Sequence, residues 1–197
     1  MVRPPPTRCA VPRATTPGAI ISAATATSIT PPSPPRTWPP VPGSRSSTST
    51  TTTATAPRIF FYESAEVFFV SLHADPSYQY PLFWGYADER GTGAGEGLNR
   101  NFPLPPGTGD DAYLAALDQA LALIADFDPA YLVVSAGLDI YGADPLGDWD
   151  ITQAGITRVG ARIAAAGRPT LLVQEGGYNL AALGANTRRL LAPLATG

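Results

Sequence analysis

The composition of the chain changes completely at one point, between Pro57 and Arg58. Residues 1–57 hold 13 of the 22 prolines and five arginines but no Asp, Glu or Lys, whereas residues 58–197 carry all 16 acidic residues and eight arginines. A segment so poor in large apolar residues cannot bury enough surface to offset its chain entropy. The sequence therefore predicts a disordered segment over 1–57 and one folded domain over 58–197.

The charge of the second segment limits the partners that the protein can have. Eight arginines stand against 16 acidic residues in 58–197, so the net charge of this segment is near −8. Such an acidic balance disfavours nucleic acid and anionic membranes and favours a polycationic partner or substrate. The lone Cys9 excludes an intrachain disulfide, and the chain has neither a signal-peptide pattern nor an apolar run of about 18 residues. These features predict a cytoplasmic protein that binds neither membrane nor nucleic acid.

Short apolar runs alternate with amphipathic stretches after Arg58, which predicts a layered α/β domain. The connection over 74–109 is rich in Gly and Pro and too long for a neutral linker, so we expect it to shape a site. Strands separated by helices imply parallel pairing, and chemistry in such sheets lies at the carboxyl ends of the strands. The expected strands cover 67–73, 131–137 and, with its following loop, 170–178; the expected helices cover 112–127, capped by Asp110 or Asp111, 153–167, opened by Thr152 and closed by Gly167, and 179–194.

Polar residues follow each expected strand at this edge of the sheet. Each also has an ordinary structural interpretation, because Asp-Pro and Gly-Gly pairs form turns and an Asp after a strand is often a helix cap. A single His without further ligands at metal spacing is weak evidence for a metal site. The residues alone predict an acidic rim on an α/β domain and leave its role open. The rim residues are His73, Asp75, Asp139, Asp144, Glu175 and Tyr178.

Several strings of this segment occur together and in a fixed order: VSLHADP, YPLFWGYADERGTGAGEG, NFPLPPGTGD, VVSAGLDIYGADPLGD and LLVQEGGYN. In this combination they resemble the zinc-dependent histone deacetylase superfamily, and most of all its bacterial acetylpolyamine aminohydrolases. The resemblance implies an arginase-like, three-layer α/β fold with a central parallel sheet, incomplete in this chain. It also implies a zinc-dependent hydrolase that removes acetyl groups from acetylated polyamines or acetyl-lysine.

The resemblance assigns catalytic and substrate-binding roles to a small set of residues. Asp139 matches the last zinc ligand of the family, and Tyr178 matches the tyrosine whose hydroxyl donates to the developing oxyanion. Gly176 and Gly177 match the glycines that let the backbone turn before that tyrosine. Tyr80 matches an aromatic residue that lines the substrate tunnel.

The resemblance also implies two sites for monovalent cations, with K⁺ as the candidate ion. The Ser71 hydroxyl and the Leu72 carbonyl match ligands of the inner site. Phe61, Ser64 and Val67 fall where the outer site takes its oxygen ligands.

The zinc site that the resemblance implies is less than half present. A catalytic zinc keeps three protein ligands, and a general base takes the proton of the attacking water. In the family the other two ligands come from an Asp-x-His string at a strand end, and the acid/base pair is two adjacent histidines upstream. This chain has one histidine, and no acidic residue precedes Glu63. The chain as given is therefore expected to bind no zinc and to show almost no activity.

Residues 44–57, SRSSTSTTTTATAP, become informative when their codons are read in another frame. If the first two bases of each codon are the last two of the true codon, a free choice of first base gives VAVLDVDYHHGNGT. This string contains the missing Asp-x-His motif and runs directly into the in-frame RIFFYES. The change at Pro57 thus predicts a frame boundary, with out-of-frame translation over 1–57. A natural disordered tail on a degenerate domain is the competing interpretation.

Two functions from other classes stay open. A non-catalytic binding module would keep the deacetylase scaffold and bind an acetylated amine without turnover. A pseudogene or sequencing product would have no function, and its leader peptide would be absent from cells. For an enzyme or a binding module the expected partner is a small acetylated amine or acetyl-lysine, and a homo-oligomer is compatible with either.

Overall fold

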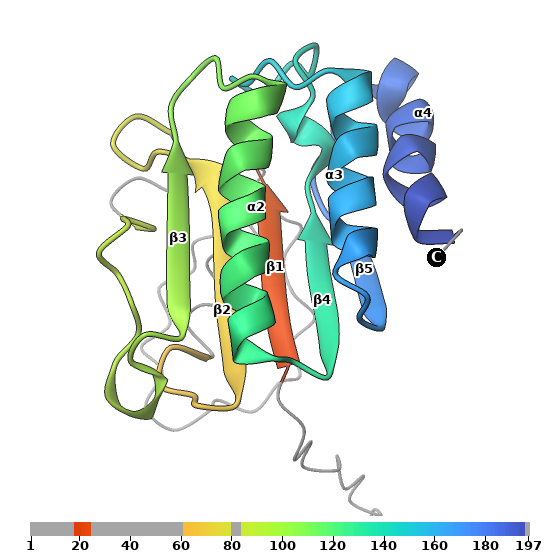
Figure 1. Cartoon of the computed structure of the whole chain (residues 1–197). Helices are drawn as coiled ribbons and strands as arrows, with labels where there is room; N and C mark the ends of the chain where they lie inside the picture. The colour runs from red at the N-terminus through yellow and green to blue at the C-terminus, as the bar shows by residue number, and fades with distance from the viewer. Residues whose placement is uncertain (1–17, 25–60, 80–83, 196–197) are drawn as a thin grey trace, which may run out of the picture.

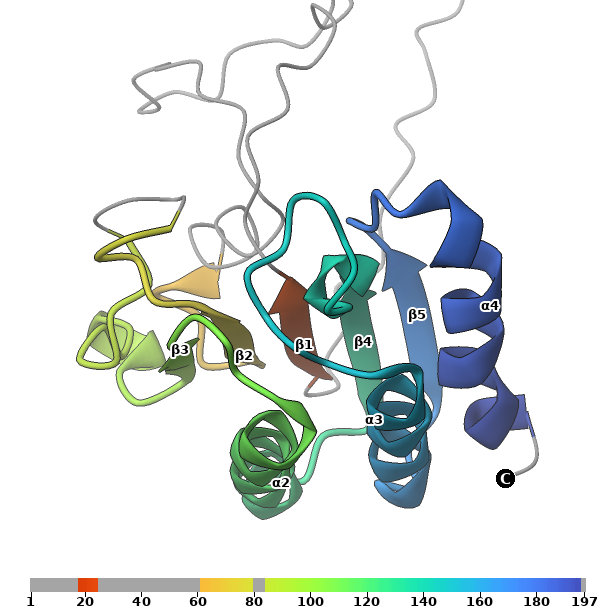
Figure 2. The ribbon, with the colours of Figure 1, turned by 90° about the horizontal axis from the view of Figure 1, so that it is seen from above.

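The structure, a computed structural model, describes residues 18–24, 61–79 and 84–195. This part of the chain forms a parallel five-stranded sheet in the order β3-β2-β1-β4-β5. Helices α2 and α3 lie side by side over one face of the sheet, and α4 packs beside α3 near β5 (Figures 1 and 2). The strands are β1 (Gly18–Ala24), β2 (Val67–Ala74), β3 (Asn99–Leu104), β4 (Tyr131–Ala136) and β5 (Thr170–Gln174); the helices are α2 (Asp110–Phe127), α3 (Gln153–Ala165) and α4 (Leu180–Leu191), with short 3₁₀ turns η1 (Gly93–Gly95), η2 (Leu138–Ile140) and η3 (Ala192–Ala195).

The parallel α/β architecture expected from the sequence is confirmed. Strands β2, β4 and β5 and helices α2, α3 and α4 lie where the hydrophobic periodicity predicts them, with ends that differ by a few residues. Helix α2 connects β3 to β4, and α3 connects β4 to β5, as parallel pairing requires.

Strand β3 lies inside the connection over 74–109, where the sequence predicts no strand. Its sequence, NRNFPL, contains a proline and an arginine and has no run of β-branched residues, so its propensity indicates a loop. Pairing with β2, in which Phe69 faces Asn99 and Ala74 faces Leu104, makes it a strand. A proline is tolerated there because β3 is an edge strand of the described sheet.

Strand β1 corrects part of the expectation that 1–57 is disordered. It takes the middle position of the sheet and pairs with both β2 and β4, so that Ile20 faces Phe69 on one side and Val133 on the other. The composition of 1–57 is dominated by its prolines, and the average conceals a short run, GAIISAA, of small and apolar residues. Such a run suits a strand with neighbours on both sides. The remainder of 1–57 lies outside the described residues.

The hydrophobic core lies between the sheet and the two helices that cover it. Side chains of β2 and β4 meet those of α2 and α3 there, and the ring of Phe68 lies 5.4 Å from that of Phe127 at the end of α2. Each fully buried aliphatic side chain contributes roughly 1.5–3 kcal/mol relative to exposure. The most completely buried aliphatic residues are Val70, Leu72, Leu114, Leu117, Leu132, Val134, Ile151 and Ile156.

The first turn of α3 agrees with the sequence, whereas that of α2 does not. Thr152 caps α3 as expected, because its Oγ1 accepts the Gly155 N–H at 3.0 Å. Helix α2 begins at Asp110, and its N-cap is Gly109, which has no side chain to cap the helix. The Asp110 carboxylate instead accepts the Thr152 N–H at 2.8 Å and the Thr152 hydroxyl at 2.6 Å, which ties the starts of the two helices together.

The ends of the remaining helices follow ordinary capping rules. Gly167, expected to close α3, follows its last turn at φ +63°, and its N–H donates to the Ala164 carbonyl. Asn179 caps α4 by accepting the Ala182 N–H at 3.1 Å.

None of the helices in the described part is long and apolar enough to cross a membrane.

Candidate active site

Asp139 and Gly176 lie against each other at the carboxyl ends of β4 and β5. Asp139 sits in η2, directly after β4, and is 1% exposed. A Cβ atom added to Gly176 would lie 2.5 Å from Asp139 Oδ2, so the loop after β5 can approach the carboxylate this closely only with a glycine. The Leu138 N–H donates to the Gly176 carbonyl at 2.9 Å and holds the two loops together.

Gly177 also occupies a position where any side chain would be strained. Its φ is +131°, outside the range that L side chains ordinarily adopt. A Cβ atom there would lie 2.9 Å from Leu183 Cδ1 and 3.0 Å from Leu138 Cβ. The two glycines therefore let the backbone pass close to Asp139 and deliver Tyr178 to the same edge of the sheet.

The Tyr178 side chain is partly buried next to two carboxylates. Burial is the main cause that raises the pKa of its hydroxyl, and the negative charges of Asp139 and Asp144 raise this pKa further. The hydroxyl therefore keeps its proton at neutral pH and remains a hydrogen-bond donor. A protonated phenol beside a buried carboxylate is suited to stabilise negative charge that develops on a substrate oxygen.

Asp144, one of the predicted rim acids, faces the protein and not the solvent. It is 6% exposed, and its Oδ2 accepts the N–H groups of Tyr178 at 2.6 Å and of Asn179 at 2.9 Å. Its Oδ1 accepts the Leu146 N–H at 3.0 Å. The sequence signal, an Asp-Pro pair, indicates a turn but cannot name partners that lie more than thirty residues further along the chain.

His73 is held by hydrogen bonds on both ring nitrogens, which agrees with its structural interpretation. The ring is 4% exposed, with Nδ1 2.9 Å from Ser71 Oγ and Nε2 2.8 Å from the Gly85 carbonyl oxygen. Because a carbonyl only accepts, this network assigns the proton to Nε2, and Nδ1 accepts from the Ser71 hydroxyl. Sequence reasoning did not single out Gly85, whose φ is +102° and where a Cβ would lie 2.4 Å from Nε2.

The residues expected to bind monovalent cations lie at two separate places, one within β2 and one at and before its start. Ser71 and Leu72 are buried within the strand. Phe61 and Ser64 belong to a turn before it, closed by the Ser64 N–H on the Phe61 carbonyl at 3.0 Å, and Val67 begins the strand. Val67 and Ser71 are separated by about 13 Å along an extended strand, so the two sets cannot share one ion.

The remaining rim acids, Asp75 and Glu175, make hydrogen bonds of their own. The Asp75 carboxylate accepts the N–H and hydroxyl of Ser77 at 2.8 and 2.6 Å, and these bonds lower the pKa of Asp75, as in an ordinary turn. The Glu175 N–H continues the β4–β5 ladder by donating to the Ala136 carbonyl. Tyr80 lies outside the described residues.

A catalytic zinc ion does not fit the described residues by themselves. Such an ion takes three protein ligands, and Asp139 is the single residue in the described part to which the resemblance assigns a zinc-ligand role. Nowhere in this part do three or more His, Cys, Asp or Glu side chains lie together in a way that could hold a metal. Residues 44–57, for which a shifted frame is compatible with an Asp-x-His motif, lie outside the described ranges.

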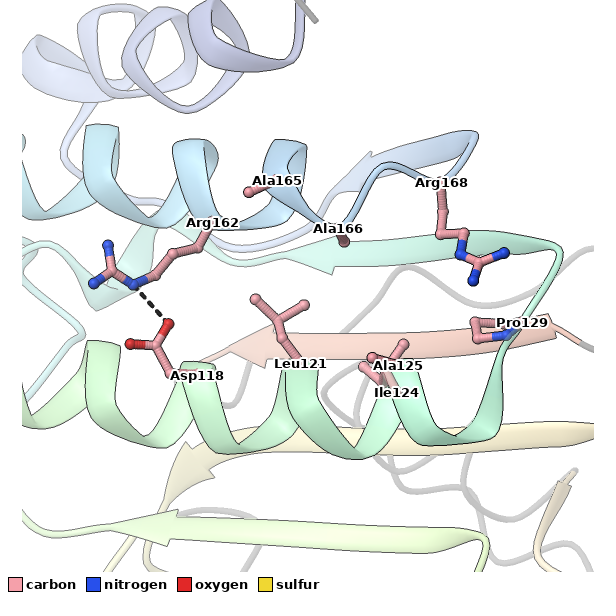
Figure 3. A pocket seen from close by; sticks show the side chains of 9 residues that line it. All are labelled: Asp118, Leu121, Ile124, Ala125, Pro129, Arg162, Ala165, Ala166 and Arg168. Atoms are coloured by element: carbon pink, nitrogen blue, oxygen red, sulfur yellow. Dashed lines mark hydrogen bonds and ion pairs between the residues drawn. The ribbon is translucent and has the colours of Figure 1, made fainter.

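A groove between α2 and α3 lies apart from these residues, on the helix-covered side of the sheet (Figure 3). Its volume is about 310 Å³, and an ion pair between Arg162 and Asp118, with N···O 2.7 Å, crosses it. Its lining is mainly apolar and includes Leu121, Ile124 and Ala165 but no residue from the carboxyl edge of the sheet. The groove is therefore not part of the candidate active site.

Comparison with known proteins gives one consistent result. Residues 58–194 match the family model of the histone deacetylase domain. Acetylpolyamine amidohydrolase 1 of Pseudomonas aeruginosa is 48% identical over 131 residues, which are 66% of this chain and 38% of that protein. Acetylpolyamine amidohydrolase of Mycoplana ramosa is 42% identical over 135 residues, 68% of this chain and 40% of that protein.

The solved structures agree. The crystal structure of acetylpolyamine aminohydrolase from Burkholderia pseudomallei covers 91% of this chain and 45% of its own, with 31% identity and a TM-score of 0.76. The chain thus spans about two fifths of the length of the curated relatives it matches. The resemblance and the deacetylase-like α/β fold, present here in part, are confirmed: the chain belongs to the histone deacetylase family.

Proposed function

We propose that residues 58–197 are the C-terminal part of a zinc-dependent deacetylase that removes acetyl groups from acetylated polyamines or acetyl-lysine. The observation that carries the proposal is the buried Asp139 carboxylate packed against Gly176, with the protonated Tyr178 hydroxyl at the same edge. The names of the relatives, acetylpolyamine amidohydrolases, support the substrate class. A small acetylated amine as partner and a cytoplasmic location belong to the same proposal.

The described residues would perform two tasks in this reaction. Tyr178 donates a hydrogen bond to the oxygen on which negative charge develops, and its raised pKa keeps the donor protonated. Gly176 and Gly177 allow the backbone before Tyr178 to pass close to Asp139. In the family zinc supplies Lewis-acid chemistry, and Asp139 contributes at most one of its three ligands here.

We therefore propose that the chain as given neither retains zinc nor turns over substrate. The match to the family model begins at residue 58, the first residue after the proposed frame boundary, which supports the interpretation of 1–57 as out-of-frame translation. A high-accuracy read of the coding DNA tests this directly. We expect an inserted or missing base upstream of the codon for Arg58; an unbroken frame would leave a natural tail on a degenerate domain.

The activity is tested with two proteins measured side by side. One is the chain as given, and in the other VAVLDVDYHHGNGT replaces residues 44–57. After dialysis against zinc, elemental analysis is expected to find little metal in the first protein and up to one ion per chain in the second. Asp139→Asn in the second protein should abolish the gain.

Each outcome of this comparison separates the candidate functions. Stoichiometric zinc in the chain as given, with turnover of an acetyl-lysine reporter that Tyr178→Phe abolishes, would contradict the proposed inactivity. Saturable binding of an acetylated polyamine without turnover would favour the binding module. No gain of zinc in the second protein would remove the support for Asp139 as a ligand.

A further inference from the structure

We infer that Asp144 is a positioning residue that holds Tyr178 in the candidate active site; the inference rests on the proposed function of Tyr178. Asp144 belongs to the loop after β4, and Tyr178 belongs to the loop after β5. The Asp144 carboxylate spans the two by accepting the Tyr178 N–H at 2.6 Å and the Asn179 N–H at 2.9 Å. Its other oxygen accepts the Leu146 N–H of its own loop.

The geometry makes these bonds strong. All three donors are backbone N–H groups, and hydrogen bonds from N–H groups to a carboxylate are roughly twice as strong as those between neutral groups. Tyr178 and Asn179 directly precede α4, so the Asp144 charge also lies at the positive end of the helix dipole. Burial to 6% exposure removes the competition of water for the same oxygens.

The loop after β5 needs such a restraint because of its two glycines. Gly176 and Gly177 permit the close approach to Asp139, but glycine populates many conformations with similar energy. A backbone with two glycines before Tyr178 cannot fix the direction of the tyrosine by its own preferences. The Asp144 carboxylate supplies the restraint directly after the two glycines, at the Tyr178 and Asn179 N–H groups. The Asn179 Nδ2 also donates to the Ala143 carbonyl at 2.7 Å.

A helix cap and a positioning residue predict different results. If Asp144 merely stabilised the start of α4, its removal would fray the helix and move Tyr178 as a consequence. If Asp144 holds Tyr178, its removal frees the tyrosine while α4 stays folded, because Asn179 still caps the helix through Ala182.

The test compares Asp144→Asn with Asp148→Asn in the full chain. Asp148 lies in the same loop and is exposed, so this control removes the same charge without removing a hydrogen bond to Tyr178. Nuclear magnetic resonance of protein labelled on backbone nitrogen and tyrosine rings reports both groups, and Tyr178→Phe assigns the ring signal. In Asp144→Asn we expect the Tyr178 and Asn179 amides to exchange with solvent roughly tenfold faster and the signals of the Tyr178 ring to show motional averaging, while the amides within α4 keep their protection.

Unchanged amide exchange and an unchanged ring signal in Asp144→Asn would overturn the inference. If that variant fails to fold, Asn179→Ala decides the matter, since it removes the helix cap and leaves Asp144 in place. The Tyr178 amide should then stay protected while α4 frays; a Tyr178 freed by Asn179→Ala assigns the restraint to the helix instead. Neither readout involves metal, so failure of the zinc measurement and failure of this inference are separate results.

Discussion

Tyr113 is the most deeply buried ionisable group of the core and a sensitive probe of it. Its ring packs edge-on to that of Trp149 at 5.5 Å, and its hydroxyl has no hydrogen-bond partner in the described part of the chain. Burial, and then the Asp139 charge, raise the pKa of this hydroxyl far above its ordinary value. Ionising it would place an uncompensated charge beside the buried carboxylate.

Tyr113 is therefore expected to make the fold sensitive to alkali. A group whose pKa is higher in the folded state contributes stability that is complete below its unfolded-state pKa, near 10, and is lost as the pH rises further. Tyr113→Phe should reduce the alkaline loss of stability and change the free energy of unfolding at neutral pH by no more than about 1 kcal/mol. Urea unfolding at neutral and alkaline pH measures both; an equal alkaline loss in the variant would contradict the assignment.

Gly177 provides a second test among individual residues. Gly177→Ala forces a side chain into a φ of +131° and against Leu138 and Leu183, so we expect it to lower the free energy of unfolding by about 1–3 kcal/mol. Gly184→Ala in α4 is the matched control, because nothing lies within 4 Å of its added Cβ. The control should stabilise the helix by up to about 1 kcal/mol. Equal effects of the two substitutions in thermal unfolding would show that the backbone at Gly177 is not special.

Of the two edge strands of the described sheet, β5 has the edge that more readily pairs with another chain. The opposite edge, β3, carries Arg100 and Pro103, which discourage further pairing. Strand β5 has no charged residue, and two of its apolar side chains, Leu171 and Val173, are 61% and 39% exposed. An uncharged edge with apolar side chains favours association between copies of the chain.

A single lysine on this strand should reduce that association. Leu171→Lys places a charge on the exposed face of β5, and we expect a lower sedimentation coefficient at high protein concentration and slower loss of soluble protein on heating. Leu180→Lys is the control, since Leu180 is 82% exposed but lies on α4 and not on the sheet edge. If both substitutions improve solubility equally, exposed apolar area and not the strand edge causes the association.

The integrity of the sheet depends on β1, which joins two halves of the domain. Strands β2 and β3 lie on one side of it and β4 and β5 on the other, and in the described part the sheet is continuous only through β1. Deleting residues 1–24 would leave β2 and β4 without their shared partner. We expect such a chain to lose its cooperative thermal transition, measured by circular dichroism; an unchanged transition would mean that another segment takes this position.

Prediction from the sequence succeeded where the signal is local. The apolar runs of β2 and β4 and the helical spacing of Leu114, Leu117, Leu121 and Ile124 predict their elements, because burial of one face imposes a period on neighbouring residues. The Thr152 cap is also a local feature, because its Oγ1 binds the N–H of a residue three positions further along the chain. The five sequence strings predict the family, because they are recognised in their order along the chain without any knowledge of which residues are in contact.

The remaining features depend on contacts between residues far apart in the chain. Strands β1 and β3 have weak propensities of their own and become strands because β2 offers hydrogen bonds on both sides. Asp110 lies where a cap of α2 was expected but binds Thr152, and Asp144 looks like a turn residue but binds Tyr178 and Asn179. A local sequence pattern determines which segments bury an apolar face. The hydrogen-bond partners of a carboxylate or of a strand edge are determined only when the chain packs, because packing decides which donors come within hydrogen-bond distance.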